Sequence, residues 1–232
     1  MKCVILCGGK GMRMGELTEH LPKPLLIVGD KPILEHIMDH YAKYGITEFI
    51  LCLGHLGDKI KAYFKNKNTG YKIEMVDTGE KSTKAQRLLK VKDMVKEEFF
   101  VSYSDDLSDV NISKLIEFHK KEKRIATLTA VRLNNPYGVI ELDEFEPNII
   151  SNFKEKPTMK EWINGGYFLF DERIFDYIKE NDELEKEVFE KLVKEKQIIA
   201  FRHQGFWKSV NNIKDYNELN EIFKNGKLGK IF

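Results

Sequence analysis

The chain has 232 residues, of which 42% are hydrophobic, and its 38 lysines and arginines against 37 acidic residues leave a formal net charge of +1. This length and apolar content suffice for one large domain with a real core, while the charge balance excludes a global field that would recruit nucleic acid or an anionic membrane. No apolar run reaches the roughly 18 residues that a membrane span needs, and the start lacks a signal-type segment, so we expect a cytoplasmic protein without nucleic-acid or membrane partners.

The first stretch of the chain joins an apolar strand to a glycine loop. Residues 3–7 (CVILC) predict a buried parallel strand, and three glycines follow it at Gly8, Gly9 and Gly11. Without Cβ atoms these residues let backbone N–H groups approach a polyphosphate, and Arg13 and Lys23 add positive charge. The stretch therefore predicts a phosphate-binding site. A plain strand-to-helix turn stays open from the residues alone, because the loop is neither a P-loop nor a dinucleotide fingerprint.

The rest of the first half alternates helical and strand patterns. The expected helices are 33–41, 58–64, 83–95 and 112–120, and the expected strands are 49–53, 73–76, 99–103 and 126–131. Such alternation implies right-handed crossovers and a mostly parallel sheet with helices on its faces. The strand at 99–103 runs into Ser104, Asp105 and Asp106. Since open α/β sheets bind ligands at the carboxyl ends of their strands, we expect the active site there.

The second half has shorter elements and an α+β character. The expected strands are 138–142, 149–153, 165–170 and 198–202, and the expected helices are 172–179, 183–194 and 213–223. We expect a single domain over residues 1–232, with a nucleotide-binding half at 1–131 and an acceptor-binding half at 132–232. The tail at 225–232 carries two glycines, which is consistent with a mobile segment or with packing on a neighbouring subunit of a homo-oligomer.

The cysteines and histidines do not predict a metal centre. Cys3, Cys7 and Cys52 all fall in predicted buried strands, and three cysteines without ligand spacing favour small core residues over disulfides or zinc. His36 and His40 have the i, i+4 spacing of two metal ligands, but no third ligand lies nearby in sequence, so a packing role is favoured. Trp207 is expected to pack in the core.

Nine sequence blocks together resemble the sugar-1-phosphate nucleotidyltransferases. They are GGKGMRM (8–14), LPKPLL (21–26), DKPIL (30–34), CLGHLGDKIKAYF (52–64), VDTG (76–79), SDDLSDVNI (104–112), FKEKP (153–157), WINGGYF (162–168) and FRHQGFW (201–207). Within that superfamily the chain most resembles the glucose-1-phosphate cytidylyltransferases. The blocks occur in family order over nearly the whole chain, which makes chance agreement improbable.

The resemblance implies a fold and a reaction. The fold is α/β, with a Rossmann-like mixed, mostly parallel sheet of the GT-A-like nucleotidyltransferase type and a smaller α+β acceptor-binding portion. The reaction is attack of an acceptor phosphate oxygen on the α-phosphorus of CTP, with in-line departure of pyrophosphate, which depends on positioning and charge neutralisation. The implied cofactor is Mg²⁺.

The resemblance also assigns roles to individual residues. Arg13 would meet the β and γ oxygens, Lys23 the charge near the α-phosphate, and Asp105 the magnesium ion. The implied nucleotide-binding set is Leu6, Gly8, Gly9, Gly11, Met12, Arg13, Lys23, Ser82, Arg87 and Ser104. The implied acceptor-binding set is Glu155, Lys156, Asn164, Gly165 and Gly166, with Lys156 on the acceptor phosphate. By position alone Asp105 also suits a cap for the turn near Asp109.

Four departures from the family pattern bear on the chemistry. Met12 replaces a threonine that can bond phosphate, residues 84–86 (KAQ) replace Thr-Gly-Gly before Arg87, and an insertion between Phe64 and Val76 is nearly absent. The fourth is Asn211, where the family has a second metal-binding aspartate. An amide oxygen still coordinates magnesium but removes one negative charge, which Asp106, a glycine in the family, is a candidate to supply.

The sequence thus predicts a magnesium-dependent cytidylyltransferase that activates glucose 1-phosphate or a related sugar phosphate for surface polysaccharide synthesis. Two alternatives remain: a cytidylyltransferase for a non-sugar phosphate such as phosphoglutamine or a polyol phosphate, and a catalytically silent nucleotide-binding subunit. The changed residues 84–86 support the first alternative, and the lost carboxylate at Asn211 supports the second.

Overall fold

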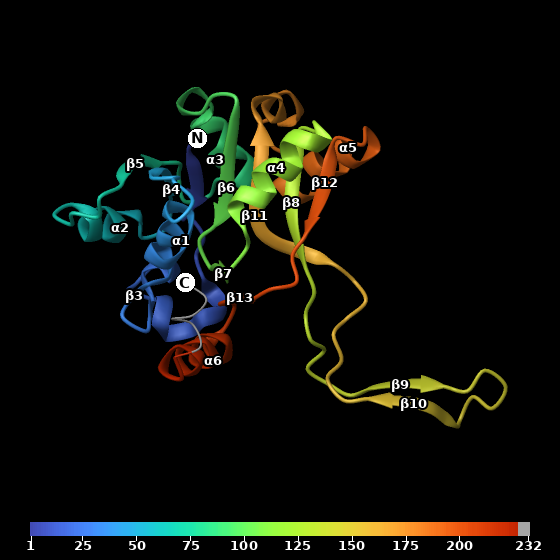
Figure 1. Cartoon of the computed structure of the whole chain (residues 1–232). Coiled ribbons are helices and arrows are strands. Elements are labelled where there is room, and N and C mark those ends of the chain that lie inside the picture. Colours follow the sequence, from blue (N-terminus) through green and yellow to red (C-terminus); the bar gives the residue numbers. More distant parts are fainter. Residues whose placement is uncertain (227–232) are drawn as a thin grey trace.

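A seven-stranded sheet runs through the computed structural model, which describes residues 1–226, and helices cover both of its faces (Figure 1). The strand order is β12–β8–β11–β6–β1–β4–β5. The bounds of these strands are β1 Cys3–Leu6, β4 Glu48–Leu53, β5 Lys72–Asp77, β6 Glu98–Tyr103, β8 Ala126–Val131, β11 Ile163–Asp171 and β12 Ile198–Arg202. Strands from both halves of the chain therefore share one sheet.

The alternation of side chains along the central strands explains why both faces are covered. Cys3 and Ile5 belong to one apolar cluster and Val4 and Leu6 to another, because successive side chains of a strand point to opposite faces. Continuous apolar strands of this kind require helices on both sides. The helices are α1 Ile33–Ala42, α2 Gly57–Phe64, α3 Lys84–Lys90, α4 Ile112–Glu122, α5 Phe189–Lys194 and α6 Ile213–Lys224.

The mixed, mostly parallel character expected from the sequence is confirmed. β1 pairs in parallel with β4 and β6, β4 with β5, and β8 with β12. β11 is the exception, since it runs antiparallel between β6 and β8. Its ladder with β8 is irregular between Asn164 and Phe168, and Gly166 has a φ of +76° there, a backbone conformation that favours glycine.

Several expected helices are shorter or tighter than the pattern indicates. The helix expected at 83–95 ends at Lys90 because Val91 leaves the helical region (φ −114°, ψ 10°), and a 3₁₀ turn, η3, follows at Lys92–Met94. The segment expected as a helix at 172–179 is a 3₁₀ helix, η4, over Glu172–Tyr177. The one expected at 183–194 begins as a π-helical turn, η5 Leu184–Val188, before α5.

Short elements that the sequence did not indicate complete the fold around the glycine loop. They are 3₁₀ helices η1 Met12–Thr18 and η2 Lys23–Leu25, and strands β2 Ile27–Val28, β3 Lys31–Pro32, β7 Asp106–Ser108 and β13 Trp207–Ser209. β7 and β13 form an antiparallel pair in which Ser209 lies opposite Asp106. Helix α6 lies against β2, where the Tyr216 hydroxyl donates to the Ile27 carbonyl at 2.8 Å.

The expected strands 138–142 and 149–153 leave the main sheet. They form an antiparallel hairpin, β9 Val139–Leu142 and β10 Ile150–Lys154, which projects from the body (Figure 1). Two extended segments of the chain connect this hairpin to the body. We call residues 137–154 the arm. Most of the tail 225–232, about which the sequence raised two alternatives, lies outside the described residues. Within residues 1–226, no helix combines the length and apolar character required to cross a bilayer.

Candidate active site

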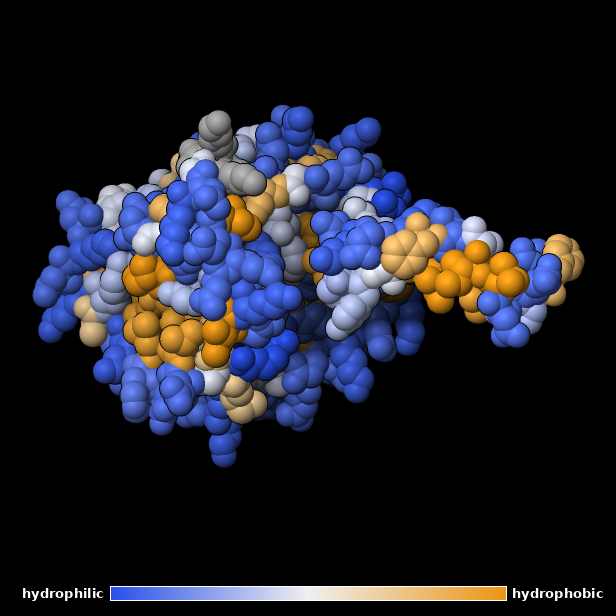
Figure 2. Space-filling view, turned by 90° about the horizontal axis from the view of Figure 1, so that it is seen from below, coloured by the Kyte–Doolittle hydropathy of each residue, from blue (hydrophilic) through white to orange (hydrophobic). Residues whose placement is uncertain are grey.

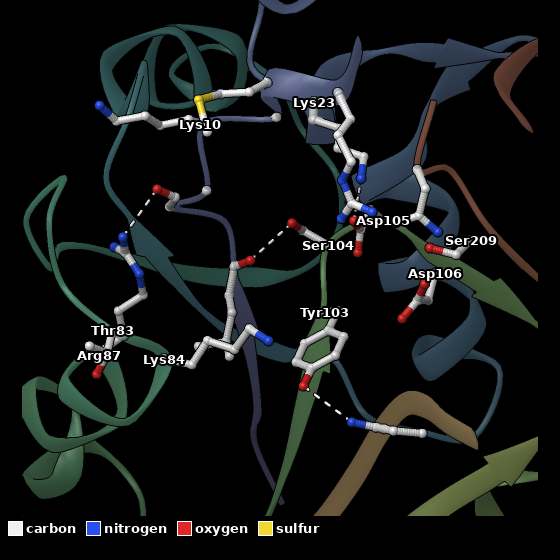
Figure 3. Close-up of a pocket in the computed structure, with 18 of the residues that line it drawn as sticks. Lys10, Lys23, Thr83, Lys84, Arg87, Tyr103, Ser104, Asp105, Asp106 and Ser209 are labelled. Atoms are coloured by element: carbon white, nitrogen blue, oxygen red, sulfur yellow. Dashed lines mark hydrogen bonds and ion pairs between the residues drawn. The ribbon is translucent and has the colours of Figure 1, made fainter. Parts of the chain in front are cut away.

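A pocket of about 740 Å³ opens at the carboxyl ends of β1 and β6, where the sequence predicts ligand binding (Figure 3). All of the predicted nucleotide-binding residues line it: Leu6, Gly8, Gly9, Gly11, Met12, Arg13, Lys23, Ser82, Arg87 and Ser104. The three candidate metal ligands, Asp105, Asp106 and Asn211, also line it. Residues more than two hundred positions apart in sequence therefore meet in one pocket.

The glycine loop is fixed at both ends by hydrogen bonds that involve its backbone. The Cys7 N–H donates to the Cys52 carbonyl at 2.9 Å, and the Ser104 hydroxyl donates to the Leu6 carbonyl at the same distance. At the far end, the Thr18 hydroxyl donates to the carbonyl of Gly11, whose φ is +65°. Met12 and Arg13 between these anchors are exposed, so their side chains are free to meet a ligand in the pocket.

Arg87 supports the glycine loop through hydrogen bonds. Its guanidinium is buried and donates to the Leu53 carbonyl (2.9 Å), the Thr78 hydroxyl (2.6 Å), the Gly8 carbonyl (3.1 Å) and the Glu80 carbonyl (3.3 Å). These bonds engage all four N–H groups of the two terminal nitrogens. Burial lowers the pKa of Arg87 from its ordinary value, but a guanidinium stays charged far above neutral pH. Arg87 therefore positions the loop, and the direct nucleotide contact that the family resemblance implies for it stays a prediction.

Gly8 is required by this packing. A Cβ placed on Gly8 would lie 2.0 Å from Nη1 of Arg87, whereas a Cβ on Gly9 would have nothing within 4 Å. The first glycine of the loop therefore makes room for the arginine, and the second leaves its surroundings open toward the pocket.

Lys23 and Asp105 both line the pocket and form an ion pair with one another (Figure 3). The Lys23 side chain is 11% exposed and that of Asp105 26%, so the pair is largely shielded from water and from salt. Lys23 is held in η2 between Pro22 and Pro24, which fix the direction of its chain. The two side chains that the resemblance singles out for charge stabilisation are thus in contact with one another.

Asn211 lines the same pocket as this pair because of the strand pair β7–β13. The Val210 N–H donates to the Asp105 carbonyl at 2.9 Å, and Asn211 follows Val210 directly in the chain. Asp105 and Asn211 together present carboxylate and amide oxygens, which are the donors that Mg²⁺ prefers, and leave further positions for phosphate oxygens and water. These two residues fit a magnesium site. Within residues 1–226 no cluster of three His, Cys, Asp or Glu side chains supplies a complete protein cage.

Asp106 sits deeper than Asp105. Its side chain is buried, its Oδ2 occupies the space beside Gly166 (2.0 Å from a Cβ placed there), and it shares a hydrogen bond with Ser209. Burial, together with the negative charge of Asp105, raises the pKa of Asp106 well above its usual range. The geometry favours Asp105 and Asn211 over Asp106 as the residues that face a metal.

A network of side chains from distant elements supports another part of the pocket. Lys84, Tyr103 and Asn164 line the pocket, and Glu185 bonds to Lys84 and Tyr103. Lys84 forms an ion pair with Glu185 and lies over the Tyr103 ring, 4.3 Å from its centroid. The Tyr103 hydroxyl hydrogen-bonds to Glu185 and accepts from the Asn164 amide at 3.3 Å. Burial and the charge of Glu185 raise the pKa of Tyr103, so the phenol stays protonated. We call these four residues the side-chain wall.

The predicted acceptor-binding residues do not all meet. Asn164 lines the pocket, while Gly165 and Gly166 are buried in β11 beside it, with the Gly165 carbonyl accepting from the Trp207 indole at 2.8 Å. Glu155 and Lys156 are exposed at the root of the arm. Lys156 lines a neighbouring groove of about 1150 Å³, which shares Trp207 with the first pocket.

Residues that the sequence did not select also line the pocket. They are Lys10, Glu80, Thr83, Lys84, Tyr103, Ile163, Glu183, Trp207 and Ser209. Lys84 had a signal, because it departs from the family pattern. Trp207 is half-buried at the pocket, whereas the sequence analysis expected it in the core. Tyr103 and Glu183 had no sequence signal of their own, since only the folded chain brings them here. His36 and His40 are buried and bond the Val28 and Val110 carbonyls, as a packing role predicts.

Comparison with known proteins decides the family. The family model described as "Nucleotidyl transferase" matches residues 2–226. The chain belongs to this family. The probable glucose-1-phosphate cytidylyltransferase of Bacillus subtilis (strain 168) is 36% identical over 251 residues, covering 98% of each protein. The glucose-1-phosphate cytidylyltransferase of Salmonella typhi is 34% identical over 254 residues, covering 98% of this chain and 97% of that protein.

The solved structures agree on the fold of this nucleotidyl transferase. A putative glucose-1-phosphate thymidylyltransferase from Bacillus anthracis superposes with a TM-score of 0.76 at 22% identity, covering 96% of this chain and 94% of that one. The expected family and GT-A-like fold class are therefore confirmed, and the chain is an enzyme of the nucleotidyltransferase class.

Proposed function

We propose that this nucleotidyl transferase is a single-domain, magnesium-dependent cytidylyltransferase that transfers CMP from CTP to glucose 1-phosphate or a related sugar phosphate and releases pyrophosphate. The observation that carries the proposal is the convergence of the glycine loop, the Lys23–Asp105 pair and Asn211 on one pocket. The similarity over 98% of the chain to proteins named glucose-1-phosphate cytidylyltransferases supports the choice of CTP and of the acceptor.

In this proposal the main-chain N–H groups of residues 8–13 bind the triphosphate, with Arg13 on its β and γ oxygens. The Lys23 ammonium exchanges its Asp105 partner for the α-phosphate, where it neutralises charge that grows as the acceptor oxygen approaches. Asp105 and Asn211 would hold Mg²⁺, which when bound supplies further neutralisation of phosphate charge. Because Lys23 is already held in the lining of the pocket, this exchange of partners needs little reorganisation.

Acceptor binding is proposed to use the side-chain wall. Asn164 and Tyr103 line the pocket and offer amide and phenol groups that suit the hydroxyls of a sugar. Lys84 is the observation that favours the alternative acceptor class, since a cation on this wall also suits a carboxylate such as that of phosphoglutamine. Lys156 meets the acceptor phosphate only if that phosphate reaches the groove beyond Trp207.

A substrate panel tests the proposal. Pyrophosphate release would be measured with CTP, UTP and dTTP, each against glucose 1-phosphate, phosphoglutamine and a polyol phosphate, at saturating magnesium. We expect the largest kcat/KM for CTP with glucose 1-phosphate. A preference for phosphoglutamine would show that the acceptor is a non-sugar phosphate. No turnover with any pair would support the alternative of a catalytically silent nucleotide-binding subunit. Product use in surface polysaccharide synthesis depends on the first outcome.

A further inference from the structure

The loop between β5 and α3 forms one edge of the pocket. We call residues 78–83 the β5–α3 loop, and Glu80, Ser82 and Thr83 of this loop line the pocket. Figure 2 views the molecule from below, the direction in which β1 and β6 run in Figure 1. Hydrophilic residues occupy the surface between the apolar areas of the body and of the arm in that view. A ligand that enters from this side therefore meets mainly hydrogen-bonding and charged groups.

Hydrogen bonds fix the backbone of the β5–α3 loop. The Lys90 ammonium donates to the Thr78 carbonyl at 2.6 Å and to the Ser82 hydroxyl at 3.1 Å. The Ser82 hydroxyl in turn donates to the Thr78 carbonyl, and Arg87 donates to the Glu80 carbonyl at 3.3 Å. Because the backbone is already fixed, a side chain of this loop contacts a ligand with little further loss of entropy.

Two other side chains at this edge of the pocket are bonded to the protein itself. The Thr83 hydroxyl accepts from the Gln86 N–H at 3.1 Å and donates to the Asp182 carbonyl at 2.8 Å. Lys84 is paired with Glu185. A ligand at this edge therefore finds these groups already engaged, as is the hydroxyl of Ser82.

Glu80 differs from these residues because half of its carboxylate is available. Its Oε1 contacts the Lys10 ammonium at 3.1 Å and the ring nitrogen Nδ1 of His55 at 3.4 Å, while Oε2 has no partner within residues 1–226. The hydrogen bond from Lys10 lowers the pKa of Glu80 below its ordinary value, so the carboxylate is ionised at neutral pH. An ionised carboxylate accepts hydrogen bonds and donates none. Glu80 thus presents an acceptor to the pocket.

Glu80 lies at the end of the pocket opposite the Lys23–Asp105 pair. In Figure 3 the Lys10 side chain extends away from that pair, toward the side on which Thr83 lies, and the Lys10 ammonium contacts Glu80. In the proposed function Lys23 meets the α-phosphate, and the base of a nucleotide is separated from its α-phosphate by the ribose. The base is therefore expected at the Glu80 end.

We propose that Oε2 of Glu80 selects the base of the nucleotide by accepting a hydrogen bond from the exocyclic amine of cytosine. Uracil and thymine carry a carbonyl oxygen at that position, and a carboxylate repels this second acceptor. Lys10 orients the carboxylate from the glycine loop. The inference rests on the proposed use of CTP and deepens it, because it names the residue that distinguishes CTP from UTP and dTTP.

The test measures the dissociation constants of CTP and UTP by titration calorimetry in the presence of Mg²⁺, a readout that does not depend on turnover. We expect the wild type to bind CTP about tenfold more tightly than UTP, and Glu80→Gln to bring the two constants within about threefold of each other. The glutamine amide accepts from an amine and also donates to a carbonyl, so it suits both bases. Glu122→Gln, which changes an exposed acid of α4, is the matched control and should keep the preference of the wild type.

Lys10→Met removes the partner of Glu80 and keeps the acceptor, so it should weaken CTP binding and retain the preference for CTP. Equal weakening of both nucleotides in Glu80→Gln would overturn the inference, because Glu80 would then only hold the loop. A wild type without a preference for CTP, or a loss of preference in Lys10→Met alone, would also overturn it.

A third nucleotide, dCTP, distinguishes the base from the ribose. If Glu80→Gln removed a preference for CTP over dCTP and left the preference over UTP unchanged, Glu80 would bind the ribose and the inference would be wrong. Tight, cytosine-selective binding that depends on Glu80 but leads to no turnover with any acceptor would refute the proposed reaction and leave the inference standing.

Discussion

The two sides of the pocket are built differently. In the proposed function, the phosphate side combines a backbone element, the glycine loop that continues β1 and is held by the buried guanidinium of Arg87, with the Lys23–Asp105 pair. The acceptor side consists of the side-chain wall, in which Lys84, Tyr103, Asn164 and Glu185 bond one another. Backbone placed by a sheet tolerates few changes, whereas a wall of side chains changes with single substitutions. In the proposed function, the phosphate side therefore fixes the reaction class, and the acceptor side sets which acceptor is activated.

The strongest test of the phosphate side is Asp105→Ala. We expect turnover to fall about a thousandfold while the fold survives, because the variant loses several kcal/mol of charge stabilisation at the reacting phosphate and leaves Lys23 without its partner. Pyrophosphate release and thermal unfolding measure the two effects. Asp93→Ala, an exposed acid in η3, is the control. Turnover like that of the wild type in Asp105→Ala would remove Asp105 from the proposed site.

The packing of the glycine loop on Arg87 is tested by Gly8→Ala. The new methyl group would meet Nη1 of Arg87, so we expect the free energy of unfolding to fall by about 1–3 kcal/mol. Gly9→Ala is the matched control, because its Cβ meets nothing within 4 Å, and its unfolding free energy should stay within about 0.5 kcal/mol of the wild type. Chemical denaturation measures both. Equal free energies of unfolding in the two variants would show that the Arg87 side chain moves aside without a loss of stability and does not position the loop.

Lys84→Met addresses the acceptor side. We expect the KM for the acceptor to change about tenfold and the KM for CTP to stay within twofold, because the substitution removes a charge-assisted contact from the wall and leaves the loop untouched. Lys81→Met, which removes a nearby exposed charge, is the control. Initial rates with each substrate varied in turn distinguish the sides. An effect on the KM for CTP alone would show that Lys84 contacts the nucleotide, and the division of the pocket into a phosphate side and an acceptor side would then be wrong.

The smallest expected effect belongs to Asn211→Asp. The sequence left open whether Asp106 replaces the missing carboxylate, but Asp106 is buried beside Gly166 and bonded to Ser209. We therefore expect the added charge at position 211 to lower the magnesium concentration for half-maximal turnover about threefold. A magnesium titration of turnover measures this. Unchanged or weaker magnesium dependence, together with a loss of activity in Asp106→Gly, would show that Asp106 does compensate.

Much of the sheet could be predicted because its signals are local. The apolar run 3–7 and the strand that ends at Tyr103 are long enough to show their type, and the glycines after β1 indicate the loop directly. β7 and β13 could not be predicted, since each has three residues and exists only because Ser209 meets Asp106 across about a hundred positions. The break at Val91 likewise follows from tertiary packing, because Val91 is fully buried.

The candidate site divides in the same way. The sequence motifs predicted the residues of the phosphate side, because the backbone geometry of that side requires glycines and prolines at particular positions. They did not reveal that Glu155 and Lys156 lie at the root of the arm, away from Asn164, since strand patterns at 138–142 and 149–153 do not say whether a hairpin joins the sheet or leaves it. They also did not reveal Tyr103 or Glu185, whose contact joins two segments about eighty residues apart.

The placement of α6 has a consequence for biosynthesis. The last described helix packs on the hairpin β2–β3 near the start of the chain, where the Asn220 amide oxygen accepts from the Gly29 N–H at 3.0 Å, and the Val210 N–H donates to the Asp105 carbonyl just before that helix begins. A ribosome makes these segments after every other part of the pocket. The nascent polypeptide therefore carries an open pocket with an uncovered hairpin until residues 207–224 have emerged, so the complete pocket forms only after these residues have been made.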